Sequence, residues 1–398
     1  MNLERLKQAR LACGLSLDAV SGRLAEKGRN VTKAAISNYE KGKRAPNALI
    51  LRDLAAVYGV VSGYFFEQSA TTVEWFSFRA KTTLGQRKRE NIQAFSSKQA
   101  ERYMQVCDLL PQSFKVDFPV RKSVSCAEEA EACAAEVRNR WTLGQDPVDS
   151  VTQCLENHGA LIVHYNEEAT TAFDGLSAKV NGKHPLLIVN SSVPVDRLRF
   201  DLLHELGHVL MDTSAVPDDE ESLAHRFASS FLVPPEKVKQ ELGKIRRNLT
   251  LSELVMLKEK YGLSVAAWLY TAGANGIINK TLSNSLWKQL SIRGWKTTEP
   301  DVFKGNEEPT KLRQAALRAV SEGLMSSRKA VHLFPELERQ LKEEGLLVES
   351  EAERLRKLPA AERKKALQAS AEKMAGFYKN DKELTGFETF GKDDFHEQ

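Results

Sequence analysis

A pair of histidines four residues apart is the feature of this sequence with the clearest chemical meaning. Residues 204–208 read His204-Glu205-Leu206-Gly207-His208, inside an apolar stretch whose spacing predicts a helix. Residues four apart lie on one face of a helix, so both imidazoles can bind one zinc ion. Glu205 projects beside the same position, where it can take a proton from an attacking water molecule and pass it to a leaving amine. The pattern predicts a metal site suited to hydrolysis, with Glu205 as the catalytic residue.

A catalytic zinc needs a third protein ligand, and the next segment supplies candidates. A second helix is expected after Asp218, its cap, and ends at Pro234. Glu221 follows His208 by 13 residues (221 minus 208), which is enough for a turn and a return to the metal. We expect Glu221 to be the third ligand and Glu220 to lie in a solvated first turn. His225, one turn further on, is either another ligand or a residue that supports one. Mn²⁺ or Fe²⁺ would also suit these ligands.

The helix that carries the histidines must pack closely against a neighbour. A glycine inside a helix costs about 1 kcal/mol, so Gly207 indicates that there is no room for a side chain. Three short segments before this helix predict a small sheet. Residues 160–165 have strand composition, and residues 173–180 and 184–189 flank a strong two-residue hairpin signal, Asn181-Gly182. A free edge of this sheet would hold an extended peptide by strand addition, which suits a protein substrate.

Several of these segments resemble the ImmA/IrrE family of metallopeptidases. They are residues 173–178, 187–190, 199–200, 204–208, 221–228 and 232–234. The resemblance implies that His204, His208 and Glu221 hold the metal and that Glu205 is the catalytic base. The family usually has Asn or Asp where this chain has His225, which affects the chemistry around the ligands.

The first 69 residues have the pattern of a small helical bundle. Apolar residues at helical spacing predict five short helices, with Ser16 and Thr32 as caps of the second and third. Residues 1–70 contain 11 Lys and Arg against 6 Asp and Glu, so this segment carries +5 while the whole chain carries +4. A local excess of positive charge indicates a polyanionic partner, a class that includes double-stranded DNA. The alternative is a helical domain that binds protein.

Residues 3–66 resemble the Cro/cI-type (XRE) helix-turn-helix family, with residues 36–46 at the centre. The resemblance implies that the third helix enters the major groove. By position, four residues would face bases and two would approach phosphates: Lys33, Ala34, Ser37 and Asn38, and then Lys43 and Arg44. The family's buried ion pair corresponds to Arg10 and Glu40. Two features depart from the family: a long connection at residues 26–31, and Asp18 where a DNA-contacting Gln is common. An acid near phosphate would weaken DNA binding.

Composition bounds the class of protein. Apolar residues make up 42% and charged residues 28% of the 398, which is typical of soluble globular chains of two to four domains. No apolar run of 18 residues and no signal peptide is present, so we expect a cytoplasmic protein, associated with the nucleoid when it is bound to DNA, and no membrane partner. The five cysteines lack a Cys-x-x-Cys spacing and are expected to be reduced.

The remaining segments are predicted to be mostly helical. Residues 99–110 have helical patterning, Ser125 and Glu128 form a capping-box pattern that opens a helix, and Asp146-Pro147 opens the next. Further helices are expected at residues 282–290, 310–322, 328–345 and 349–379. They would sense a signal, form a homodimer or cover the site.

The expected fold is multidomain and mainly α with a small β-sheet. It consists of a five-helix XRE-type bundle (residues 1–69), a helical connector (70–124), an α+β zincin-like metallopeptidase core (125–275), a helical C-terminal domain (276–380) and a disordered tail (381–398). The function expected is that of a DNA-associated zinc endopeptidase that controls a stress, prophage or mobile-element response by cleaving a regulator, such as an XRE-type repressor. The alternatives are a DNA-binding regulator whose metal domain senses or scaffolds without catalysis, and an interaction protein with neither activity.

Overall fold

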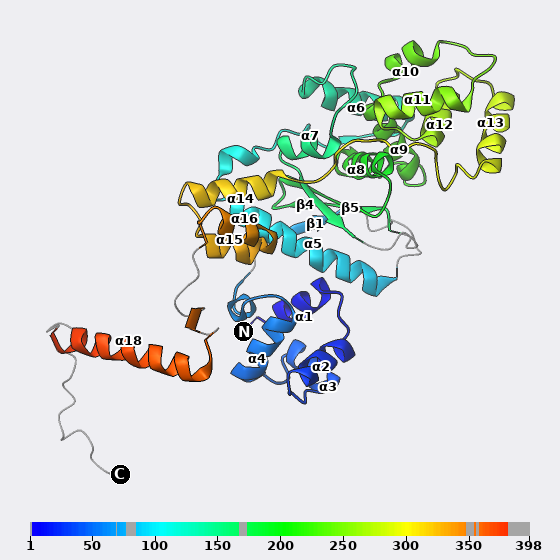
Figure 1. Cartoon of the computed structure of the whole chain (residues 1–398). Coiled ribbons are helices and arrows are strands. Elements are labelled where there is room, and N and C mark those ends of the chain that lie inside the picture. The colour runs from blue at the N-terminus through cyan, green and yellow to red at the C-terminus, as the bar shows by residue number, and fades with distance from the viewer. Residues whose placement is uncertain are drawn as a thin grey trace. The chain divides into compact units, whose positions relative to one another are not determined.

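The computed structural model describes residues 2–68, 70–76, 85–166, 173–347, 354–355 and 358–380. The fold is mainly α-helical with a small β-sheet, as predicted (Figure 1). The chain divides into two compact units, Met1–Met325 and Ser326–Gln398. The finer boundaries at residues 69, 124 and 275 stay predictions, and the expected disordered tail lies outside the described residues. Within the described part of the chain, no helix is long and apolar enough to cross a membrane.

Four α-helices and a 3-10 turn form the N-terminal bundle. They are α1 (Leu3–Ala12), α2 (Leu17–Glu26), α3 (Lys33–Glu40), α4 (Ala48–Val57) and η1 (Ser62–Phe65). Ser16 and Thr32 cap α2 and α3, as predicted, because each side-chain oxygen accepts a backbone N–H three residues on. The buried pair also forms as expected: Nε of Arg10 donates to Oε1 of Glu40 at 2.6 Å, and Nη2 donates to Oε2 at 2.9 Å. It ties α1 to the end of α3, the helix predicted to enter the groove.

A long helix, α5 (Gln86–Cys107), contacts both the bundle and the sheet. It begins 13 residues before the helix predicted from residue 99 (99 minus 86). Toward the bundle, Nη1 of Arg5 donates to both carboxylate oxygens of Glu101 at 2.7 Å. Toward the sheet, the ring of Phe95 lies edge-on to Tyr165, with centroids 5.4 Å apart. The short η2 (Pro111–Phe114) follows.

The main sheet has the strand order β1-β4-β5-β3. The strands are β1 (Val73–Trp75), β3 (Leu161–Tyr165), β4 (Gly175–Val180) and β5 (His184–Asn190). The predicted hairpin joins β4 to β5, and Asn181 and Gly182 both have positive φ (51° and 65°), as a two-residue turn of this kind requires. β3 runs parallel to β5. A second pair, β2 (Lys122–Ser123) with β6 (Met211–Asp212), is also parallel.

The prediction of a free sheet edge is wrong for most of β4. β1 pairs antiparallel with it, from Val73 opposite Val180 to Trp75 opposite Ala178, and Phe76 N–H donates to the Ser177 carbonyl at 3.1 Å. This segment can form a strand because it is rich in β-branched and aromatic residues, which fit a half-buried pleated surface. Among the described residues, only the first two positions of β4, 175 and 176, have no partner strand on this side.

The helix predicted to carry the metal ligands is α8 (Val195–Leu210). It packs on β4 and β5, and α5 lies on the other side of the sheet (Figure 1). Helices α7 (Val151–Asn157) and α9 (Glu220–Leu232) pack on α8, and α6 (Ala127–Arg140) packs on α9. The close packing expected at Gly207 is confirmed, because a Cβ there would lie 3.4 Å from the Ala224 Cα of α9.

Three predicted helix starts are shifted along the chain. α9 is capped at Asp219 rather than Asp218, since residues 213–219 are used in turns. Cys126 is the cap of α6, which puts Glu129 rather than Glu128 in the third helical position, and Glu129 accepts from both Ser125 N–H and Oγ. α7 begins at Val151 and not at Pro147.

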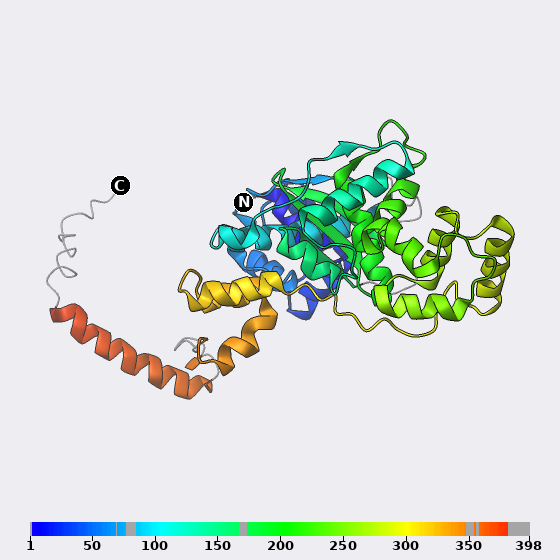
Figure 2. The same cartoon turned by 90° about the horizontal axis from the view of Figure 1, so that it is seen from above.

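The later helices of the first unit are α10 (Pro235–Leu242), α11 (Leu251–Tyr261), α12 (Val265–Ala274), α13 (Lys280–Ile292) and α14 (Lys311–Ser321). Both views place α10 to α13 side by side at one end of this unit (Figures 1 and 2). The second unit contains α15 (Ser327–Leu333), η3 (Pro335–Leu337), α16 (Glu338–Glu343) and α18 (Ala360–Asn380). The stretch predicted as helical over residues 328–345 is interrupted at Pro335, since proline cannot continue the preceding hydrogen-bond ladder.

Candidate metal centre

Helices α8 and α9 bring the three predicted ligands together. The Nε2 atoms of His204 and His208 lie 3.1 Å apart on one face of α8. From α9, Oε2 of Glu221 lies 3.3 Å from Nε2 of His204, and Oε1 lies 3.7 Å from Nε2 of His208. One ligand atom from each residue falls within 4.8 Å of the other two. The predicted trio is therefore preorganised around one point.

The spacing of these atoms fits a tetrahedral divalent cation. With metal–ligand bonds of about 2.0–2.2 Å, tetrahedral ligands lie roughly 3.3–3.6 Å apart. The two Nε2 atoms lie 3.1 Å apart, and the two oxygens of Glu221 lie 3.3 Å from one of them and 3.7 Å from the other, close to this range. Two imidazole nitrogens that face each other at 3.1 Å also need a cation or a shared proton between them. Two nitrogens and one carboxylate suit zinc, and also manganese or iron.

Glu220, the residue before the expected ligand Glu221, contacts one of the predicted ligand histidines. The sequence predicted that Glu220 would lie in a solvated turn, but its Oε1 lies 3.2 Å from Nδ1 of His208 and its side chain is 27% exposed. A carboxylate on the other ring nitrogen fixes the tautomer and orientation of a ligating histidine. Burial lowers the pKa of His208, but this hydrogen bond and the nearby carboxylates outweigh burial and raise it.

The pKa values of Glu221 and Glu205, the other two acids of the site, are shifted in opposite directions. A hydrogen bond from His204 lowers the pKa of Glu221 to about 2, which keeps it an anionic ligand. Burial raises the pKa of Glu205, against the opposing effect of His208 and His204. A carboxylate with a raised pKa is suited to accept and release a proton near neutral pH. Its Oε2 is buried with no hydrogen-bond partner among the described residues.

His225, expected either to ligate or to support a ligand, stands outside the trio. Its ring packs on that of His204, with centroids 4.7 Å apart, and on Phe200 at 5.6 Å. This placement makes it a wall of the site next to the ligands.

The third helix of the bundle exposes most of the residues expected to contact DNA. Lys33, Ala34 and Asn38 are exposed and Ser37 is half-buried, while Lys43 and Arg44 are exposed in the turn that follows. The departure noted at Asp18 has a structural consequence, because its carboxylate lies 3.3 Å from Nζ of Lys33. This acid therefore competes with phosphate for one of the basic residues on the exposed face.

Two family models match the chain, one over the N-terminal bundle and one over the region that contains α8 and α9. Residues 6–65 match a model described as "Helix-turn-helix", and residues 156–272 match one described as "IrrE N-terminal-like domain". The chain carries an XRE-type helix-turn-helix followed by an ImmA/IrrE-type domain. It has the organisation of a DNA-binding regulator with a metallopeptidase-like domain. A comparison with curated proteins finds no match.

In the ImmA/IrrE-type domain, Glu205 lies against Gly175 of β4, and this contact gives a first prediction. A Cβ added to Gly175 would lie 2.7 Å from both Cγ and Oε1 of Glu205. Since these distances are shorter than van der Waals contact, Gly175→Ala is expected to displace the buried Glu205 side chain. A misplacement of about 1 Å costs on the order of 100-fold in rate. We expect kcat for peptide cleavage to fall about 10- to 100-fold with unchanged zinc content. Gly63→Ala, where an added Cβ meets nothing within 4 Å, is the control, and equal rates for both variants would contradict the prediction.

The helix-turn-helix gives a second prediction, at Asp18. Removing its charge frees Lys33 for phosphate, so Asp18→Asn should tighten binding to a random-sequence DNA duplex about threefold to tenfold at low salt. The plot of log affinity against log salt concentration should become steeper. Glu4→Gln, which removes one exposed negative charge from the first turn of α1, is the control. An equal gain from both variants would attribute the effect to net charge and contradict a role for the Asp18–Lys33 pair.

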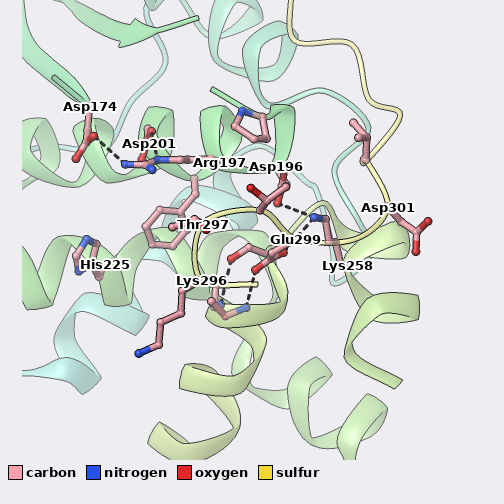
Figure 3. A pocket seen from close by; sticks show the side chains of 17 residues that line it. Asp174, Asp196, Arg197, Asp201, His225, Lys258, Lys296, Thr297, Glu299 and Asp301 are labelled. Atoms are coloured by element: carbon pink, nitrogen blue, oxygen red, sulfur yellow. Dashed lines mark hydrogen bonds and ion pairs between the residues drawn. The ribbon is translucent and has the colours of Figure 1, made fainter. Parts of the chain in front are cut away.

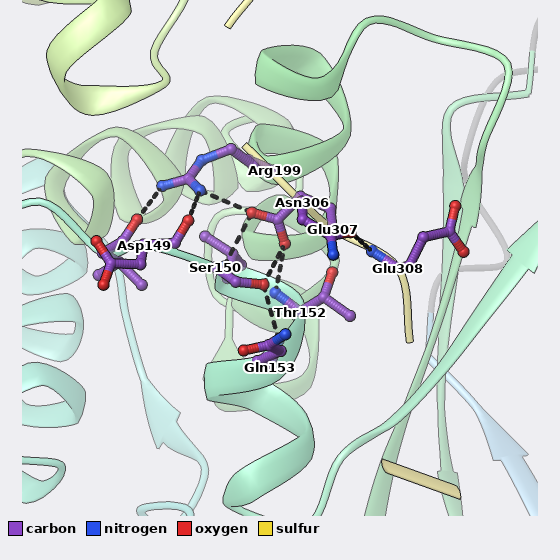
Figure 4. Close-up of polar contacts among 10 residues, drawn as sticks. Asp149, Ser150, Thr152, Gln153, Arg199, Asn306, Glu307 and Glu308 are labelled. Carbon is purple, nitrogen blue, oxygen red and sulfur yellow. Dashed lines mark hydrogen bonds and ion pairs between the residues drawn. The ribbon is translucent and has the colours of Figure 1, made fainter. Parts of the chain in front are cut away.

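A buried ion pair anchors helix α8 of the ImmA/IrrE-type domain to a segment beyond the matched residues. Nη1 of Arg199 in α8 donates to Oε1 of Glu307 at 2.7 Å, and both side chains are almost fully buried (Figure 4). Arg199 also donates to the carbonyls of residues 148 and 149. Glu307 accepts the backbone N–H of Val151 at 3.0 Å and of Thr152 at 2.6 Å, which caps α7. Together with the N-cap Ser150, whose Oγ accepts the Gln153 N–H at 3.2 Å, these contacts explain why α7 starts at Val151.

Proposed function

We propose that this protein is a DNA-associated, zinc-dependent endopeptidase that regulates transcription. It would control a stress, prophage or mobile-element response by cleaving a regulatory protein. The observation that carries the proposal is the convergence of His204, His208 and Glu221 on one point, with the buried carboxylate of Glu205 beside them.

The chemistry follows from the donor set and from Glu205. His204, His208 and Glu221 would hold the cation, and Glu220 would hold the ring of His208 in its ligating orientation. A divalent cation bound there supplies the Lewis acidity that polarises a peptide carbonyl and makes water acidic near neutral pH. The Glu205 carboxylate takes the proton of the attacking water and delivers it to the leaving amine nitrogen.

A protein substrate is favoured because Glu205 lies against Gly175, and positions 175 and 176 of β4 have no partner strand on their outer side among the described residues. These first residues of β4 would pair with an extended segment of the substrate. An XRE-type repressor is the proposed substrate class. The helix-turn-helix would concentrate the enzyme near a DNA-bound substrate and so raise its effective concentration. Four residues would face bases and two would contact phosphates: Lys33, Ala34, Ser37 and Asn38, and then Lys43 and Arg44.

The test compares wild type with Glu205→Gln in the native host, with and without DNA damage. New protein N-termini are mapped by mass spectrometry. A cleavage seen only with wild type supports a peptidase and identifies its substrate. Identical maps under every condition would contradict the proposal.

One observation favours a second candidate function. β1 occupies most of the β4 edge, which leaves little length for a substrate strand. This suits a DNA-binding regulator whose metal domain is a sensor or scaffold without catalysis. Normal regulation by Glu205→Gln, together with loss of regulation in His204→Ala, would support that candidate.

A further inference from the structure

A pocket of about 510 Å³, shown in Figure 3, borders the predicted metal site. Its walls come from the first half of α8, His225 of α9, the start of α12, Lys258 of α11 and the loop at residues 296–302. The loop lies beyond the residues that match the ImmA/IrrE-type model. Sites for small molecules and side chains in proteins span about 300–1,000 Å³, so this pocket is large enough to hold a ligand group.

The pocket borders the metal site through two shared side chains. His225 and Phe200 both line it. The ring of His225 also packs on the ligand His204, with centroids 4.7 Å apart. A group in the pocket would therefore lie next to whatever is bound at the metal.

Carboxylates outnumber cationic side chains in its lining. There are five carboxylates and three Lys or Arg side chains: Asp174, Asp196, Asp201, Glu299 and Asp301 against Arg197, Lys258 and Lys296. Two of the cations are each shared by two acids. Nζ of Lys258 lies 3.0 Å from Glu299 and 3.4 Å from Asp196, and Arg197 lies 2.8 Å from Asp174 and 3.6 Å from Asp201. The lining keeps a net negative charge.

Asp196, one of these acids, is buried and has a carboxylate oxygen without a hydrogen-bond partner among the described residues. The side chain of Asp196 is only 5% exposed, and its Oδ2 faces Lys258. Its Oδ1 has no hydrogen-bond partner among the residues that the structure describes. A buried polar atom without a partner costs free energy, and a charged acceptor costs more than a neutral one. A cation in the pocket would offset the charge of this carboxylate without a direct bond to Oδ1.

We propose that this pocket binds a guanidinium or ammonium group on an apolar stem, and that it takes an arginine or lysine side chain of the substrate beside the scissile bond. The cation would meet the excess carboxylates, and the stem would lie along Phe200, Ala266 and Val302. The substrate role rests on the proposed peptidase function, whereas the cation site does not.

The first test uses small probes and needs neither metal nor catalysis. Butylguanidinium and its neutral analogue butylurea are titrated into the full-length protein by calorimetry. We expect butylguanidinium to bind at least tenfold more tightly. Equal affinities, or no binding of butylguanidinium, would overturn the pocket assignment.

Two variants test whether the cation binds in the pocket. Asp196→Asn should remove most of the preference for the cation. Asp301→Asn should weaken it about threefold and leave the fold intact, because residue 301 is exposed and has φ of 53°, which asparagine tolerates. Glu236→Gln removes a 70% exposed acid from α10 and should change nothing. Equal losses from Asp301→Asn and Glu236→Gln would attribute binding to overall charge and overturn the assignment.

The second test connects the pocket to the metal site. Arginine hydroxamate and norleucine hydroxamate are titrated into the zinc-loaded protein, since a hydroxamate chelates zinc and the side chain then samples the pocket. At least tenfold tighter binding of the arginine compound supports the substrate role. Equal affinities with both compounds would overturn it and leave a site for a free cation. Failure of the norleucine compound to bind would count against the zinc site, and the first test then decides the pocket by itself.

Discussion

Replacing Glu205 with glutamine is expected to lower kcat for peptide cleavage about 1,000-fold and to leave zinc binding unchanged. General acid–base catalysis by a positioned side chain contributes about 10²- to 10⁴-fold. Glutamine keeps the size of the side chain in its fully buried position but cannot accept a proton. Because the three ligand atoms come from other residues, the metal site stays intact.

The neighbouring acid Glu220 provides the matched control. Glu220→Gln also removes one carboxylate, but from Nδ1 of His208 rather than from the reacting groups. Loss of such a partner typically weakens metal binding about 10- to 100-fold. At saturating zinc, Glu220→Gln should therefore recover most of its activity and Glu205→Gln should not. Zinc affinity and single-turnover cleavage of the natural substrate measure the two effects separately. Undiminished cleavage by Glu205→Gln would assign the base to another residue.

The parts of the site set by helix periodicity could be predicted from the sequence. His204 and His208 are four residues apart, so local geometry alone puts them on one face of α8. The role of Glu220 was missed because two successive acids on a helix point in different directions, and the sequence does not give the angle between α8 and α9. The known preference of ligating histidines for a carboxylate partner was the available signal.

Long-range pairings were beyond prediction from the sequence. Residues 73–75 pair with β4 more than 100 positions later, and no local pattern indicates which edge a three-residue strand will join. The same holds for Arg199 and Glu307, which are 108 residues apart. An arginine followed 108 residues later by its glutamate partner forms no periodic pattern. Both pairings depend on how the whole first unit packs.

Replacing Arg199 with methionine should destabilise the first unit by about 3–5 kcal/mol. Methionine fills similar space but leaves Glu307 buried without its cation, and removing one partner of a buried pair typically costs this much. The loss should be measured as a shift in the urea midpoint at constant slope. Arg199→Met combined with Glu307→Gln should recover part of it, because glutamine keeps one acceptor oxygen for the N–H groups of Val151 and Thr152.

A surface ion pair with a similar N–O distance tests whether burial, rather than distance, produces this effect. Nε of Arg318 lies 2.6 Å from Glu322 in α14, against 2.7 Å for Arg199 and Glu307. The side chains of the surface pair are 57% and 43% exposed, and those of the buried pair are 0% and 2% exposed. Exposed helical pairs contribute about 0.3–0.5 kcal/mol, so Arg318→Met should barely move the midpoint. Equal shifts from the two variants would contradict the anchoring role of Glu307. A large shift from Arg199→Met alone, with weaker zinc binding, would mean that a segment beyond the ImmA/IrrE-type match holds the metal helix in place.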